Sequence, residues 1–329
     1  MEHDISWKSF FSDDERYADA INGLGCNGRQ IVKDTDLSEL DTQMGFLRGS
    51  RFSLTSFAGR GKGHVKIRDM VRKAAFGMNF AIIGIEAQEV IDYGIPLRNM
   101  TYDAGEYERQ AAKIRKAVRK NHQGLSRGEY LYGFRKNSRL YPAVTFILYA
   151  GAEEWDGPKS LHDILDFTDI PEELRQMVAD YPIHLVEIRK LADTSIFKTD
   201  IRQVFDFIRC SEDKNALRQL VEQDTYFQHM EEDAFDVATL YSDAKELIQV
   251  KDLYKKEERI DMCKAITELM EDSRAEGVLA GMEAGRAEGI DEKTRTIVLN
   301  MLNRGMSDED IRVLAECEQK LIDEVRSEF

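Results

Sequence analysis

Two carboxylates and an amide stand where a pair of strands would bring them together. Asp69 lies in a short segment that ends near residue 75, and Glu86 and Gln88 lie at the end of the next segment. Side chains alternate along a strand, so Glu86 and Gln88 project from one face, and Lys73 shares the face of Asp69. Two carboxylates in a basic field are typical of a Mg²⁺ site acting on a phosphate, with Lys73 assisting the nucleophile. A salt-bridged hairpin next to basic neighbours is the alternative interpretation of this spacing.

The elements that must position these residues form a sheet with helices. Polar groups at the end of a buried apolar strand are expected at the open end of an α/β sheet. Strands separated by helices favour an α/β or α+β core with parallel pairing. The expected strands are 66–75, 79–88, 142–149 and 183–188, and the expected helices are 12–23, starting at a Ser12–Glu15 capping box, and 104–121.

The helix expected at 104–121 has a basic stripe on one side and an apolar face on the other. Ala111, Ile114 and Val118 form the apolar face, which we expect to pack on the sheet. The stripe has helical spacing and is expected beside the carboxylate pair, where it would hold a DNA backbone. Its residues are Arg109, Lys113, Lys116 and Lys120. Tyr107 and Gln110, one turn apart, either point toward the metal site or pack.

The charge of the chain is distributed unevenly. The net charge is −15, yet residues 48–73 hold eight Lys or Arg against one acid, and residues 109–139 hold ten against one. These two segments together carry +16 and the remainder of the chain carries −31. A phosphate-backbone ligand requires such a basic region, and ordinary solvated helix faces are the alternative interpretation.

Several segments together resemble the Rpn-type recombination-promoting nucleases and transposase-like proteins, a family of the PD-(D/E)XK nuclease superfamily. The resemblance is most specific between residues 66 and 165 and extends over most of the chain. It is carried by RD at 68–69, IEAQ at 85–88, PLR at 96–98, YDAGEY at 102–107 and the passage from the strand at 142 to WDGP at 155–158. The resemblance implies a restriction-endonuclease-like α/β fold: a mixed-sheet core flanked by helices, followed by a mostly α-helical C-terminal region.

The same resemblance implies roles for individual residues. Asp69 and Glu86 would bind Mg²⁺, for which Mn²⁺ can substitute, and Gln88 stands where the superfamily usually has lysine. Lys73 is then the candidate to replace that lysine. The superfamily also tends to place an acidic residue on the first helix, for which Asp19 and Glu15 are available. The accessory candidates are Asp19, Arg98, Tyr107 and Gln110.

Composition and length limit the classes of protein to which the chain can belong. The 329 residues are 42% hydrophobic and 33% charged with only 5 prolines, which is typical of a folded, helix-rich chain. No apolar run approaches the roughly 20 residues that span a bilayer. The acidic N-terminus lacks the features of a secretory signal, and the four cysteines are widely spaced, so we expect a cytoplasmic protein without a disulfide framework or zinc site.

Four segments are expected along the chain. Residues 1–195 form the nuclease-like domain, 196–275 a helical extension, 276–291 a glycine-repeat linker and 292–329 a small acidic helical tail. Glycines recur every four residues at 277, 281, 285 and 289. They either form a small face on which another helix packs closely or belong to a frayed linker. The glycine repeat or the C-terminal helices would mediate any homo-oligomer.

The expected function is a Mg²⁺-dependent DNA endonuclease of low sequence specificity, linked to recombination or transposition. No zinc finger or recognition helix is evident that would read bases. Two alternatives remain open at this point. One is a degenerate nuclease fold that binds nucleic acid or a protein partner without cutting. The other is a structural or interaction protein that assembles through the spaced glycines.

Overall fold

The computed structural model describes residues 2–39, 70–76, 79–121, 123–242, 244, 246–256 and 259–327. The chain divides into two compact units, Met1–Ala265 and Ile266–Phe329. The predicted metal ligand Asp69 and most of the basic segment 48–73 lie outside the described residues.

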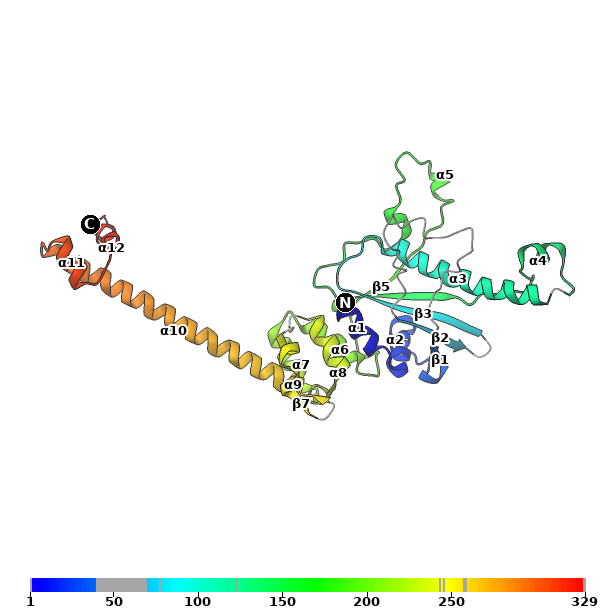
Figure 1. The fold of residues 1–329 in the computed structure, drawn as a ribbon, viewed down its shortest axis with the longest axis horizontal. Coiled ribbons are helices and arrows are strands. Elements are labelled where there is room, and N and C mark those ends of the chain that lie inside the picture. Colours follow the sequence, from blue (N-terminus) through cyan, green and yellow to red (C-terminus); the bar gives the residue numbers. More distant parts are fainter. Residues whose placement is uncertain are drawn as a thin grey trace. The chain divides into compact units, whose positions relative to one another are not determined.

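A mixed five-stranded sheet forms the centre of the first unit, with strand order β1-β2-β3-β4-β5 (Figure 1). The strands are β1 Leu37–Glu39, β2 Met70–Phe76, β3 Asn79–Gln88, β4 Ala143–Tyr149 and β5 His184–Glu187. β2 pairs antiparallel with β1 and β3, whereas β4 pairs parallel with β3 and β5. The predicted α/β class and parallel pairing are confirmed. β3 is the middle strand and buries Ile82, Ile83 and Ile85, as an apolar run in a covered sheet must.

Helix α2 (Asp14–Cys26) packs against the β2–β3 hairpin. Tyr17 Oη donates hydrogen bonds to the carbonyl oxygens of Met70 and Ile83, at 3.2 and 2.9 Å. The N-cap of α2 is Asp13, whose carboxylate accepts from the backbone N–H groups of Glu15 and Arg16. The predicted cap at Ser12 is therefore wrong by one residue, because two adjacent residues can both cap and the aspartate does so.

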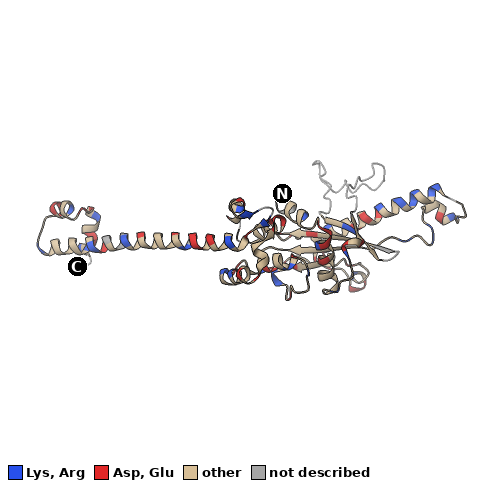
Figure 2. Ribbon diagram, turned by 90° about the horizontal axis from the view of Figure 1, so that it is seen from below, with Lys and Arg blue, Asp and Glu red and all other residues tan. Residues whose placement is uncertain are grey.

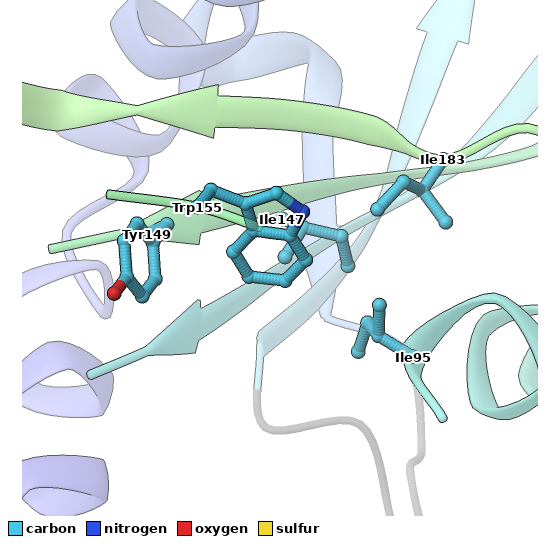
Figure 3. Close-up of a cluster of buried hydrophobic side chains, with 5 residues drawn as sticks. All are labelled: Ile95, Ile147, Tyr149, Trp155 and Ile183. Atoms are coloured by element: carbon cyan, nitrogen blue, oxygen red, sulfur yellow. The ribbon is translucent and has the colours of Figure 1, made fainter. Parts of the chain in front are cut away.

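A small apolar cluster fixes the start of helix α3 (Ile95–Lys120) on the sheet. Ile95, the first residue of α3, packs with Ile147 and Tyr149 of β4, with Trp155 and with Ile183 (Figure 3). Tyr149 and Trp155 meet edge to face with ring centroids 5.1 Å apart. Because Ile147 pairs with Glu86 across the sheet, the cluster lies beside the predicted site. It therefore fixes the position of the first turn of α3 relative to the end of β3.

The predicted domain boundary at residue 195 is not a structural boundary. Helix α1 (Glu2–Phe10) carries Trp7, which is buried against Phe205 and Tyr241. On α2, Arg16 binds Asp200 through two hydrogen bonds of 2.7 Å. These contacts join residues about 200 positions apart, so the helices after residue 195 belong to the first unit.

The remaining elements of the first unit are short. After β5 they are η4 Ile188–Lys190, α6 Ile201–Cys210, α7 Lys214–Gln223, η5 Thr225–Gln228, β6 Met230–Glu231, α8 Glu232–Leu240, α9 Glu246–Tyr254, β7 Lys255–Lys256 and β8 Arg259–Ile260. Before β5 they are η1 Asp34–Asp36, α4 Arg127–Tyr132, η3 Leu161–Ile164 and α5 Glu172–Arg175. The strands β6, β8 and β7 form a second, small antiparallel sheet.

The second unit is helical. Its helices are α10 Met262–Asn303, which begins in the first unit, α11 Asp308–Leu314 and α12 Gln319–Ser327. Val298 of α10, Ile311 of α11 and both Ile322 and Val325 of α12 are buried together. The structure places the glycine repeat at 276–291 within α10, so this segment is helical. A Cβ added at any of the four glycines would meet no atom outside the neighbouring helix backbone within 4 Å.

Candidate functional site

Glu86 and Gln88 lie at the carboxyl end of β3, on the face covered by α3. Glu86 is 4% exposed and Gln88 is half-buried. The Gln88 amide donates a hydrogen bond to Glu86 Oε1 at 3.3 Å. The strand alternation predicted this shared face, and the structure brings the two side chains together.

Arg98 is the third residue of this site. It lies in the first turns of α3, and its Nη2 is 3.0 Å from Glu86 Oε1 while its Nη1 is 2.8 Å from Asp92 Oδ2. One guanidinium thus bridges two carboxylates, which satisfies the requirement that a buried charge be paired. Of the accessory candidates, Arg98 contacts the predicted centre.

Asp92 is a site residue that sequence reasoning missed. Its Oδ1 accepts a hydrogen bond from the Gly94 backbone N–H at 2.8 Å, and its Oδ2 binds Arg98. Gly94 is the N-cap of α3, and Pro96 stands in the first turn, a position that proline favours. The signal was present in the sequence, because an aspartate two residues before the N-cap forms an Asx turn. Asp92 therefore sets where α3 begins and holds Arg98 toward Glu86.

Lys73 lies away from Glu86. It pairs with Ile82 across the hairpin, and Ile82 precedes Glu86 by four residues on β3. That separation is about 13 Å along a strand. The ammonium of Lys73 lies 5.7 Å from the ring centroid of Tyr141 instead. Lys73 shares the expected face but does not stand where a lysine would replace Gln88.

Tyr107 and Gln110 hold the beginning of β4 in place. Tyr107 Oη accepts a hydrogen bond from the Ala143 backbone N–H at 3.1 Å. Gln110 binds the backbone of Tyr141 in both directions, accepting from its N–H at 2.7 Å and donating to its carbonyl at 3.2 Å. Since Ala143 pairs with Ile82, both side chains lie near the end of the sheet opposite Glu86. The packing interpretation of this pair is the one the structure supports.

The basic stripe of α3 begins further along the helix than Arg98, the site residue on that helix. Arg109 follows Arg98 by eleven residues on α3, about 16 Å along the helix axis. The stripe therefore runs away from Glu86 and does not lie beside it, contrary to the prediction. In Figure 2 the ribbon of the second half of α3 is largely blue, the colour of Lys and Arg positions. Arg109 is held by Glu106 through two hydrogen bonds of 2.7 and 2.6 Å, whereas Lys113, Lys116 and Lys120 are exposed.

Asp19 stabilises the segment before α6. Its Oδ2 accepts hydrogen bonds from the backbone N–H groups of Lys198 and Thr199, both at 2.7 Å, and from the Thr199 hydroxyl at 2.8 Å. Asp19 is buried by this arrangement. The structure thus gives the predicted accessory acid a packing role on α2.

A cavity of about 210 Å³ lies on the same face, toward the opposite end of β3 from Glu86. Its lining includes Lys73 and Ile82 from the hairpin, Arg109 and Lys113 from α3, and Arg139. The sequence placed Arg109 and Lys113 on one stripe, but only the fold adds Lys73 and Arg139 to them. The result is a cationic pocket separated from the buried carboxylate.

Among the described residues, no group of three or more His, Cys, Asp or Glu side chains is arranged to hold a metal ion. The oxygen donors that the described site offers are the carboxylates of Glu86 and Asp92, both bound to Arg98, and the Gln88 amide oxygen. Hard divalent cations such as Mg²⁺ take oxygen donors of this kind and retain several waters, so the donor types fit.

Comparison with known proteins gives no relatives. No family model, curated protein or solved structure matches this chain. Within the part of the chain that the structure describes, no helix is long and apolar enough to cross a membrane.

Proposed function

We propose that this chain is a Mg²⁺-dependent DNA endonuclease with a PD-(D/E)XK fold, of low sequence specificity and acting in the cytoplasm on recombination or transposition intermediates. The observation that carries the proposal is the buried Glu86 beside Gln88 at the carboxyl end of the middle strand. Asp69 precedes Met70 directly in the sequence, and Met70 pairs with Ile85, the residue before Glu86.

The residues proposed to hold Mg²⁺ are Asp69 and Glu86, with Gln88 adjoining them. A bound Mg²⁺ supplies a water of lowered pKa and neutralises charge on the scissile phosphate. The chain's own contribution is to orient Glu86: Gln88 and Arg98 both hold Oε1, and Asp92 holds Arg98. This network fixes the carboxylate before any substrate binds.

The ion pair between Arg98 and Glu86 also favours a second candidate function. Arg98 already neutralises Glu86, and Lys73, the candidate for the missing lysine, lies beside Ile82. Both features fit a degenerate nuclease fold that binds nucleic acid without cutting it.

Plasmid cleavage by the purified chain separates the two functions. We expect nicked or linear product with Mg²⁺ and none with EDTA or with Asp69→Ala, while DNA binding persists in that variant. Salt-sensitive DNA binding without cleavage in wild type would replace the endonuclease by the binding fold. Cleavage that survives both Asp69→Ala and Glu86→Ala would show that the site is assigned wrongly.

A further inference from the structure

The second half of α3 and the segment that follows it form a basic arm, which we define as residues 109–121 and 123–139. Gly133 packs over Arg115, whose guanidinium lies 5.6 Å from the Phe134 ring centroid. Arg135 donates a hydrogen bond to the Asn121 carbonyl at 2.9 Å. The segment after α4 therefore returns along α3, and the cavity lined by Lys113 and Arg139 lies where it reaches the sheet. In Figure 1, α4 lies beside the C-terminal end of α3.

The cavity is built to take an anion. Four cations line it, Lys73, Arg109, Lys113 and Arg139, against one carboxylate, Glu106, which Arg109 already engages. Its volume of about 210 Å³ suits a phosphate group rather than a whole nucleotide with its base. The basic surface does not stop at the cavity, because Lys116 and Lys120 continue it along α3. A polyanion uses such a continuous surface and a single small anion does not.

The tip of the arm adds an apolar element to this basic surface. Tyr130 and Tyr132 of α4 are 73% and 74% exposed, and Leu131 between them is 68% exposed. Their backbone is ordered by Glu129, whose carboxylate accepts from the N–H groups of Lys136 and Ser126 at 2.9 and 2.8 Å. Exposed aromatic rings amid lysines and arginines are the combination that binds single-stranded nucleic acid, because unpaired bases stack on the rings.

We propose that the basic arm binds single-stranded nucleic acid, with one backbone phosphate in the cavity and unpaired bases on Tyr130 and Tyr132. The role of the arm in a reaction rests on the proposed endonuclease function. If that function holds, the substrate is DNA that is single-stranded next to the cut. In this proposal Lys73 binds a phosphate of the strand and takes no part in catalysis. The cavity lies about 13 Å along β3 from Glu86, so the arm holds the strand at a distance from the bond that is cut.

The test measures binding of the full chain to a fluorescein-labelled 20-residue oligothymidine and to a 20-base-pair duplex, by anisotropy over a range of salt in EDTA. We expect Lys113→Ala/Arg139→Ala to reduce the slope of log K against log salt by about 0.7, because both side chains contact the one phosphate in the cavity and each lost phosphate contact on a single strand removes about 0.7. We expect Tyr130→Ala/Tyr132→Ala to weaken oligothymidine binding at least about fivefold without changing the slope. Lys214→Ala and Leu174→Ala, which change exposed side chains elsewhere, serve as matched controls.

Three outcomes overturn the inference: unchanged slope and affinity in both double variants, equal losses in the controls, or an equal loss of duplex and oligothymidine binding in the tyrosine variant. Binding in EDTA is independent of cleavage. A chain that binds through the arm but never cuts therefore refutes the proposed function alone. A chain that cuts while the arm variants bind normally refutes the arm alone.

Discussion

Arg98 and Glu86 form an ion pair that joins the first turns of α3 to the end of β3. Their side chains are 17% and 6% exposed, and Arg98 Nη2 lies 3.0 Å from Glu86 Oε1. The pair therefore lies largely out of water, where removing one partner costs far more than the pair contributes as a whole. This asymmetry makes the pair both a structural clamp and a restraint on the proposed metal ligand.

Arg98→Met is expected to lower the free energy of unfolding by about 3 kcal/mol, since it leaves Glu86 buried without its cation. The double variant Glu86→Gln/Arg98→Met is expected to be more stable than Arg98→Met alone. Urea unfolding of the two single variants and the double variant measures the coupling. Arg218→Met is the control, because its partner Glu222 is exposed and that pair contributes below about 1 kcal/mol. Additive effects of the two site changes would contradict the coupling.

A chain ending at residue 265 is expected to unfold cooperatively, whereas one ending at residue 195 is expected not to fold. The shorter chain lacks Asp200 and Asp233, which bind the buried Arg16 at 2.7 Å, and it exposes Trp7. Burial lowers the pKa of Arg16, but hydrogen bonds and charge from Asp200 and Asp233 outweigh it and raise the pKa above its usual value. Thermal unfolding by circular dichroism checks this. Cooperative unfolding of residues 1–195 alone would restore the predicted domain boundary.

The Glu129 carboxyl is expected to titrate near pH 2 in the folded chain. Hydrogen bonds from the Lys136 and Ser126 backbones lower its pKa from 4.5 to about 2. A lowered folded pKa means that the stabilisation is fully present above about pH 4.5 and is lost as the pH falls toward 2. NMR titration of the carboxyl carbon gives the midpoint, and amide exchange at Lys136 reports whether the loop opens over the same range. A midpoint at 4.5 would show that these hydrogen bonds are not held in solution.

Replacing Gly277, Gly281 and Gly285 together by alanine is expected to stabilise α10. Alanine is favoured over glycine in a helix by about 1 kcal/mol per residue, and a Cβ added at any of the three meets no atom within 4 Å. Thermal unfolding and analytical ultracentrifugation of the full chain check stability and assembly together. A lower melting temperature with loss of an oligomer would instead assign the glycines to a helix–helix contact between copies.

Local sequence patterns predicted the strands that carry the site. The apolar run at 79–88 is β3, and 142–149 and 183–188 overlap β4 and β5 closely, because buried parallel strands have uninterrupted β-branched sequences. The alternation that placed Glu86 and Gln88 on one face is likewise a local property of a strand.

The features of the site that could not be predicted from the sequence depend on contacts between distant residues. Lys73 projects from the predicted face of the sheet. Its distance from Glu86 is set by the hairpin register, in which Lys73 pairs with Ile82. The link from Arg16 to Asp200 spans 184 residues and leaves no local signal. The basic residues of α3 lie far from Glu86 because of the direction in which the helix runs over the sheet. Helical periodicity in the sequence does not encode that direction.

The most direct test of the central claim is the rate of Mg²⁺-dependent strand cleavage by Glu86→Gln, compared with wild type and with Glu173→Gln, an exposed carboxylate on α5. The substitution keeps the shape of Glu86 and removes a charge proposed to bind the metal. We predict at least about a hundredfold slower cleavage for Glu86→Gln, because the metal supplies several kcal/mol of transition-state stabilisation, and an unchanged rate for Glu173→Gln. Cleavage by Glu86→Gln at the wild-type rate would contradict the assignment of Glu86 to the catalytic centre.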